Sequence, residues 1–180
     1  YSLSQFLDNF TLYMYCFDDV SFKVIESMEL ESVVPVHYDE FENDELKEIK
    51  SEKERMYEYY WACVAYLTKR TMQLEGVETV TYLDADLMFF SSPEDLLKMP
   101  ADVDVLIQPN NFSAEEVSQF GPVGYYCSGW VGVRNNDNGN KILDWWNSKC
   151  MKWCKVSFEE GKFGDQKYLD DWRVRFDNVR

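Results

Sequence analysis

Two aspartates at the end of an apolar, β-prone run are the residues of this 180-residue chain best suited by type and spacing to chemistry. The run Thr79–Leu83 mixes β-branched and aromatic residues without polar alternation, which predicts a strand covered on both faces. Asp84 and Asp86 follow it. Because residues two apart in an extended segment point to the same side, both carboxylates are expected to converge on one cation, with Ala85 small enough to let a ligand approach. Oxygen ligands favour Mg²⁺ or Mn²⁺.

The alternative is that Asp84 and Asp86 are solvated turn residues, since so short a motif also arises by chance. Their position favours the metal site, because open α/β sheets place ligands just beyond the carboxyl ends of their strands. Two buried carboxylates would also repel each other and lose hydration, and a cation would offset both costs. We therefore expect both aspartates to be metal ligands.

The composition excludes several classes of protein. With 46% hydrophobic residues the chain should fold, and a formal net charge of −15 disfavours nucleic acid or an anionic membrane as partner. No run approaches the ~20 apolar residues of a transmembrane segment, and the first residues lack a signal-peptide pattern. An odd number of cysteines, five, within apolar runs suits a reducing compartment. We expect a cytoplasmic protein, with peripheral membrane association as an alternative and the Golgi lumen disfavoured.

Strand-like and helix-like segments alternate along the chain, which predicts an α/β fold. No repeat or low-complexity segment divides it, so a single domain over residues 1–180 is expected. The apolar face of the longest helix is predicted from Met56, Tyr60, Cys63 and Leu67. Strands are expected at residues 11–17, 33–36, 79–83, 102–108 and 127–133, helices at 21–28, 44–74 and 138–158, and a long loop at 110–126.

Other polar residues stand where a ligand could meet them. Asp165 and Gln166 are expected at a helix start after a glycine turn, where Asp165 could also be only a helix cap. Gly129 and its neighbour Ser128 lie in a predicted strand whose glycines allow close approach of a ligand or of a neighbouring element. The single histidine, His37, lacks a triad signature and is expected to be structural.

Several of these segments together resemble a known family. Tyr82-Leu83-Asp84-Ala85-Asp86 followed by Phe89-Phe90-Ser91-Ser92-Pro93, then the helix with Trp145-Trp146 and Cys150, then Phe163-Gly164-Asp165-Gln166-Lys167-Tyr168-Leu169, resembles the nucleotide-diphospho-sugar transferases, GT-A glycosyltransferases akin to the glycogenin-like (family 8) enzymes. The resemblance spans most of the chain. It implies a GT-A, Rossmann-like central sheet, mixed and mostly parallel, flanked by helices.

The resemblance also implies a function and a role for each site residue. The chain would be a metal-dependent glycosyltransferase that moves a hexosyl or hexosaminyl group from a nucleotide-diphosphate sugar donor to a saccharide or glycoconjugate acceptor. Asp84 and Asp86 would hold Mn²⁺ or Mg²⁺, and Asp165 and Gln166 would be the catalytic pair beside the transferred sugar. Donor contacts would come from these residues: Arg55, Asp84, Ala85, Asp86, Ser128 and Gly129.

The sequence departs from the family pattern in two respects. Ser128-Gly129 stands where related enzymes often have Asn-Ala-Gly or Asn-Val-Gly. The family's first strand and last segment, which can supply nucleotide contacts and a third metal ligand, are not recognised, so a catalytic domain truncated at both ends is expected. Two other functions stay open: a HAD-type phosphatase with Asp84 as nucleophile and Asp86 as general acid, and a non-catalytic sugar-binding module.

Overall fold

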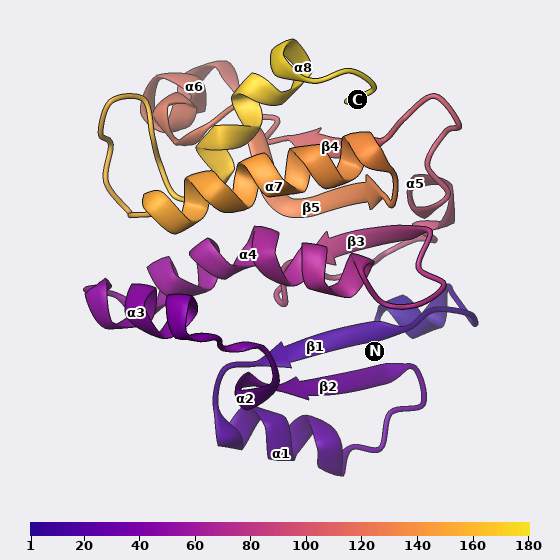
Figure 1. Ribbon diagram of the computed structural model, residues 1–180. Helices are drawn as coiled ribbons and strands as arrows, with labels where there is room; N and C mark the ends of the chain where they lie inside the picture. Colours follow the sequence, from indigo (N-terminus) through magenta and orange to yellow (C-terminus); the bar gives the residue numbers. More distant parts are fainter. The chain divides into compact units, whose positions relative to one another are not determined.

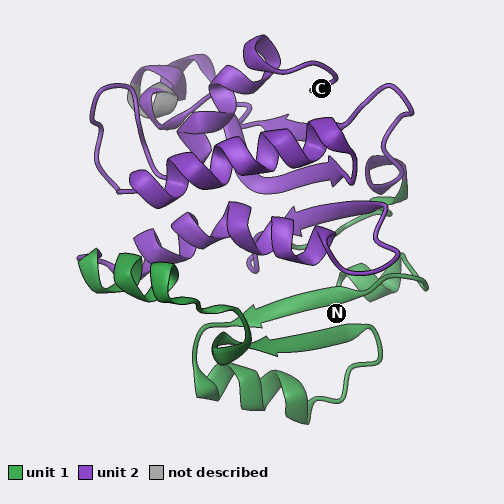
Figure 2. Ribbon diagram, in the orientation of Figure 1, with its two compact units in different colours: residues 1–52, 88–94 green, residues 53–87, 95–180 purple. Residues whose placement is uncertain are grey.

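A computed structural model describes the backbone of residues 1–180 and the side chains of residues 1–118 and 122–180. The chain forms two compact units, residues 1–52 with 88–94 and residues 53–87 with 95–180 (Figure 2). The α/β class is confirmed. One central, mostly parallel sheet is not found, because the strands lie in a two-stranded parallel sheet and a separate three-stranded antiparallel one. The expectation of a single domain over residues 1–180 stays a prediction, and the division into two compact units does not decide it.

The first unit is a β-α-β arrangement followed by short helices. Strands β1 (Leu12–Cys16) and β2 (Val33–His37) pair in parallel and are joined through α1 (Asp19–Ser27), as Figure 1 shows. His37 has the structural role expected of it: its Nε2 lies 2.9 Å from Asp19 Oδ1, and its Nδ1 accepts the backbone N–H of Asp39. The other helices of this unit are η1 (Leu3–Gln5), α2 (Tyr38–Phe41) and α3 (Asp44–Glu52).

The second unit is built on the antiparallel sheet β3-β5-β4. Its strands are β3 (Thr79–Leu83), β4 (Val105–Pro109) and β5 (Tyr126–Arg134). Leu83 pairs with Trp130, and Pro109 pairs with Tyr126. The carboxyl ends of β3 and β4 therefore lie beside the first half of β5, at the same end of this sheet. The helices are α4 (Met56–Met72), α5 (Glu94–Leu97), α6 (Ala114–Phe120), η2 (Gly121–Val123), α7 (Asp137–Lys152), η3 (Gln166–Asp171) and α8 (Trp172–Arg175).

Helices α4 and α7 lie side by side against this sheet and form its core with it (Figure 1). The predicted apolar face of α4 is half right: Cys63 and Leu67 are buried, whereas Met56 and Tyr60 are 48% and 39% exposed. In α7, Trp146 is fully buried in the core, and half-buried Trp145 packs against it. None of the helices in the described part of the chain is both long and apolar enough to cross a membrane.

Two predicted helices are shorter in the structure. The helix expected over residues 44–74 is interrupted at 53–55, where Arg55 has extended backbone angles, φ −130° and ψ 129°. The first turn of α4 makes a contact with the segment after α7: the buried Glu58 side chain accepts the backbone N–H of Val156 at 2.8 Å. The helix expected to reach residue 158 ends at Lys152. In the long predicted loop, α6 and η2 form, and the side chains of residues 119–121 lie outside the described ones.

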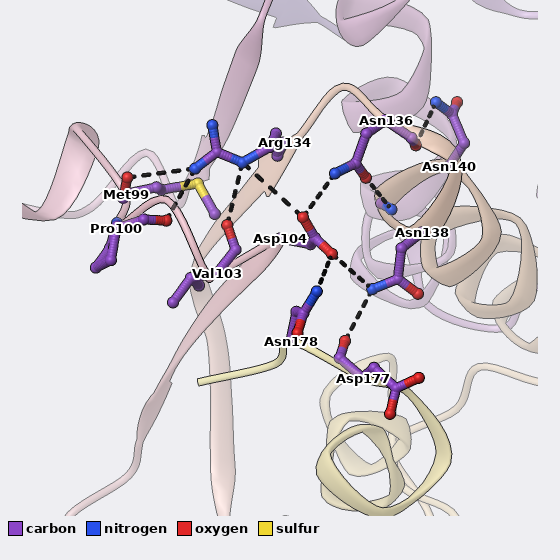
Figure 3. Close-up of polar contacts among 11 residues, drawn as sticks. Met99, Pro100, Val103, Asp104, Arg134, Asn136, Asn138, Asn140, Asp177 and Asn178 are labelled. Atoms are coloured by element: carbon purple, nitrogen blue, oxygen red, sulfur yellow. Dashed lines mark hydrogen bonds and ion pairs between the residues drawn. The ribbon is translucent and has the colours of Figure 1, made fainter.

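A buried carboxylate at the start of β4 ties the C-terminal segment to this unit (Figure 3). Asp104, 6% exposed, accepts side-chain N–H groups of Asn136, Asn138 and Asn178 at 2.6–3.0 Å, and Arg134 lies 3.9 Å away. Burial alone would raise the pKa of Asp104, but these hydrogen bonds and the Arg134 charge outweigh it and hold the pKa below its ordinary value. Loss of this charge would weaken all three hydrogen bonds, because a charged acceptor binds a donor more strongly than a neutral one.

We predict that Asp104→Asn lowers the free energy of unfolding by about 2–4 kcal/mol at pH 7, because it removes a buried charge that several donors share. A carboxylate with a depressed pKa contributes its stability above the unfolded pKa of about 4, and this contribution is lost as the pH falls through the folded value. Urea denaturation from pH 7 to pH 2 measures both effects.

Asp102→Asn is the matched control, since Asp102 is 70% exposed and pairs only at the surface with Arg180. It should cost about 0–1 kcal/mol. If the two variants are equally stable, the Asp104 network does not hold the C-terminal segment.

Candidate active site at the end of strand β3

Asp84 is positioned by the ladder between β3 and β5. Its backbone N–H donates to the Gly129 carbonyl at 3.0 Å, which extends the strand pairing by one residue beyond Leu83. The carboxylate lies directly over Gly129, where an added Cβ would stand 2.9 Å from Asp84 Oδ2. Position 129 therefore has to be glycine if Asp84 is to keep this place. The predicted close approach at Gly129 is to the Asp84 side chain.

Asp86 does not continue the strand. Ala85 and Asp86 form an exposed turn, closed by a 3.3 Å hydrogen bond from the Leu87 N–H to the Asp84 carbonyl. The alternation used to predict convergence of the two carboxylates thus stops at Asp84, because the chain turns before the second aspartate. The turn still keeps Asp86 near Asp84, since the charges of both act on the Tyr82 phenol.

Tyr82 links these acids and was not assigned a role from the sequence. Its hydroxyl donates to Asp84 Oδ1 at 2.7 Å. Burial, then the charges of Asp84, Asp165 and Asp86, raise the pKa of Tyr82 far above its usual value, so the phenol stays protonated and remains a donor. The available signal was strand alternation, since Tyr82 and Asp84 are two residues apart and share a face.

Asp165 joins the site from the other end of the sequence. It is 4% exposed, and its backbone carbonyl accepts the indole N–H of Trp146 at 2.9 Å. It precedes η3, but its side chain makes no capping hydrogen bond, so the interpretation as a simple helix cap fails. Among the described side chains its Oδ2 has no hydrogen-bond partner. A buried carboxylate oxygen left without a partner is costly unless a ligand uses it.

The electrostatics of Asp165 follow from this environment. Burial raises the pKa of the carboxyl to about 7, a hydrogen bond from the Ser128 side chain opposes the shift, and the nearby charge of Asp84 adds to it. Two acids and Ser128-Gly129 are therefore brought together at the end of β3. A group that can lose or gain its proton near pH 7 is suited to acid–base chemistry or to binding a cationic or hydroxylated ligand.

The contacts of the remaining predicted residues, Gln166 and Arg55, lie away from Asp84. Gln166 is half-buried, and its side-chain amide donates to the Val123 carbonyl at 3.3 Å, so it contacts the loop before β5. Arg55 is exposed at the start of α4, where its guanidinium donates to the Tyr57 hydroxyl at 2.6 Å. The described contacts do not bring either residue against Asp84.

The donor set at this site fits a hard cation in part. Asp84 and Asp86 provide carboxylate oxygens, the ligands that Mg²⁺ and Mn²⁺ prefer. Within the described part of the chain, no three or more His, Cys, Asp or Glu residues are grouped closely enough to hold a metal ion. A cation here would need further oxygens from water or from a phosphorylated ligand, as Mg²⁺ sites with one or two carboxylates commonly do.

The chain is similar to known proteins along nearly its whole length. The chain is 29% identical over 185 residues to the uncharacterized protein YfnF of Bacillus subtilis (strain 168), covering 99% of this chain and 61% of the relative. It is 27% identical over 182 residues to the uncharacterized protein YfnD of the same organism, covering 99% of this chain and 58% of the relative. The chain thus spans about three fifths of these relatives.

A family comparison matches a segment of this chain that includes all the predicted site residues, from Arg55 to Gln166. Residues 9–174 of this chain match the family described as nucleotide-diphospho-sugar transferase. On this match, the chain belongs to the nucleotide-diphospho-sugar transferase family.

Proposed function

We propose that this protein is a metal-dependent glycosyltransferase that moves a hexosyl or hexosaminyl group from a nucleotide-diphosphate sugar to a saccharide or glycoconjugate acceptor. The observation that carries the proposal is the Asp84 carboxylate held over the bare backbone of Gly129, with the buried Asp165 close enough for the Asp84 charge to act on it. Oδ2 of Asp165 has no hydrogen-bond partner among the described side chains. Family membership supplies the class of donor. A phosphatase gains no support from it.

Each residue has a separate task in this proposal. Asp84 and Asp86 would hold Mn²⁺ or Mg²⁺, which offsets the negative charge that gathers on the departing nucleoside diphosphate. Tyr82 fixes one oxygen of Asp84 by its hydrogen bond and leaves the other for the ligand. Ala85 and Gly129 have little or no side chain, so the donor can approach the backbone there.

Asp165 and Gln166 would face the sugar. Oδ2 of Asp165 lacks a protein partner among the described side chains and would accept a hydrogen bond from a sugar hydroxyl. The carboxylate would also stabilise the positive charge that develops on the sugar ring. Ser128 orients the Asp165 carboxyl by its hydrogen bond. Arg55 would contact the diphosphate as a charged hydrogen-bond donor.

Asp86→Ala is expected to abolish Mn²⁺-dependent binding of the donor, because Asp86 supplies one of two protein ligands to the cation. The fold should remain cooperative, since Asp86 is exposed. Calorimetric titration with UDP-, GDP- and CDP-sugars, with and without a chelator, measures this. Asp95→Ala, another exposed acid, is the control. If neither the substitution nor the chelator changes the affinity for the donor, the metal site is refuted.

Arg55→Ala should weaken donor binding by about 1.5–3 kcal/mol, the usual scale of a charge-assisted hydrogen bond. Arg70→Ala, at the opposite end of α4, should leave the affinity unchanged. Lys53 is a poorer control, because its ammonium group donates to the Cys154 carbonyl at 2.9 Å and so supports the fold. Equal, negligible effects at positions 55 and 70 would make Arg55 an ordinary surface charge.

Asp165→Asn should lower turnover by roughly two or more orders of magnitude with nearly unchanged nucleotide affinity. The same variant should stabilise the metal-free protein at pH 8. The unfolded carboxyl ionises near pH 4 and the folded one near pH 7, so native Asp165 loses stability as the pH rises between these values, and asparagine does not.

Single-turnover kinetics and denaturation at several pH values measure the two effects of Asp165→Asn separately. A stable variant with full turnover would remove Asp165 from the catalytic machinery. A slow variant that is also unstable at every pH would point to a structural role.

A further inference from the structure

A series of aromatic rings runs from the start of α4 to the loop after α7, and we call it the aromatic ledge: Tyr57, Trp61, Phe163 and Phe158. Neighbouring ring centroids are 5.0 Å apart between Tyr57 and Trp61, 6.2 Å between Trp61 and Phe163, and 4.9 Å between Phe163 and Phe158. Phe158 is 60% and Tyr57 38% exposed, so both keep ring surface open to solvent. The ledge is therefore a series of adjoining rings that is open to solvent at both ends, with Trp61 and Phe163 half-buried between them.

The backbone holds the ledge in place. Gly164 has φ +51°, and an added Cβ would meet the Trp61 ring at 3.3 Å, so the main chain rests on that indole. The Gly164 N–H donates to the Lys155 carbonyl at 3.0 Å. Between Phe158 and Phe163 the chain turns back on itself through the bridge between Glu159 and Lys162. The rings are therefore presented by a fixed segment, which lowers the entropy cost of binding.

Arg55 defines one end of the ledge. Its guanidinium lies over the Tyr57 ring, 5.9 Å from the centroid, and binds the Tyr57 hydroxyl. The other end, at Phe158, is separated from it by Trp61 and Phe163. In the proposed function Arg55 contacts phosphates, so the ledge leads from the diphosphate side of the site toward Phe158.

The place of Asp165 decides which part of a substrate the ledge would meet. Asp165 follows Gly164 directly, and its partnerless oxygen would face the sugar. In a nucleotide-diphosphate sugar the base and the sugar lie at opposite ends of the diphosphate. Gly164 rests on Trp61, so this ring of the ledge is nearest to Asp165. Phe163 and Phe158 lie beyond Trp61 from the Arg55 end, on the side from which the acceptor would have to approach the sugar.

We propose that the aromatic ledge is the acceptor subsite and binds a pyranose ring of a neutral saccharide, an inference that rests on the proposed transferase function. The C–H face of a pyranose is apolar and packs on an aromatic ring, while its hydroxyls remain in water or meet polar groups at the edge. Polar groups are present in the turn between Phe158 and Phe163, which contains Glu159 and Lys162. Both contact Trp153: Glu159 accepts its indole N–H, and the Lys162 ammonium lies 5.5 Å from its ring centroid.

The experiment compares Phe158→Leu, which keeps apolar volume without a ring, with Phe158→Tyr, which keeps the ring. Neutral hexose oligosaccharides are titrated by saturation-transfer NMR, and Mn²⁺ with nucleotide sugars is titrated separately by calorimetry. Phe158→Leu should weaken oligosaccharide binding about three- to tenfold, and Phe158→Tyr should retain it. Nucleotide-sugar affinity should stay constant in both. Phe90→Leu, at a Phe that is 86% exposed in the other unit, should change nothing.

The outcomes separate the ledge from the transferase itself. If the native protein binds nucleotide sugars but no neutral oligosaccharide, the acceptor subsite is wrong and the proposed function stands. If Phe158→Leu weakens nucleotide binding alone, the ledge stacks a nucleobase, which also overturns the proposal. If oligosaccharides bind, Phe158→Leu impairs their binding, and no nucleotide sugar binds, the ledge is a saccharide site and the transferase proposal fails.

Discussion

The site depends on one close approach, that of the Asp84 carboxylate to the Cβ-free position 129. The hydrogen bond from the Asp84 N–H to the Gly129 carbonyl fixes the backbone, and the absence of a side chain at 129 leaves room for Oδ2. Any larger residue there would displace the carboxylate, because a Cβ at 2.9 Å from an oxygen is not tolerated. A strand pair thus holds an acid at a strand end, where α/β proteins commonly bind ligands.

The other residues reach this point through the packing of α7 and η3. Trp146 in the core donates to the Asp165 carbonyl, which anchors the residue before η3. Asp170 accepts the backbone N–H groups of Tyr125 and Tyr126, which ties η3 to the start of β5. Asp165 can therefore keep one carboxylate oxygen buried without a partner among the described side chains, because its backbone is also held by the fold. The Asp104 network holds the segment after α8 in the same unit.

Much of this could be read from the sequence. Thr79–Leu83 is a strand as predicted, because its β-branched and aromatic residues favour extended backbone. The expected covering of both faces is wrong, since Thr79 is exposed and the other four residues are only half-buried. The grouping of Asp84, Ser128-Gly129 and Asp165 came from the family resemblance, since no local pattern connects residues so far apart. The antiparallel order β3-β5-β4 was missed, because single-strand patterns carry no pairing direction. The break at Arg55 was missed because no glycine or proline marks it in the sequence.

The central claim is that the end of β3 holds a divalent cation against a diphosphate. Its most direct test is the anomalous X-ray signal of Mn²⁺ in crystals grown with a nucleoside diphosphate. The account predicts one manganese peak between the carboxylates of Asp84 and Asp86 and the phosphates, with Asp165 beside the space for the sugar. Metal–oxygen distances should be about 2.1 Å, close to those of Mg²⁺. A diphosphate bound away from Asp84, or manganese held without either aspartate, would contradict it.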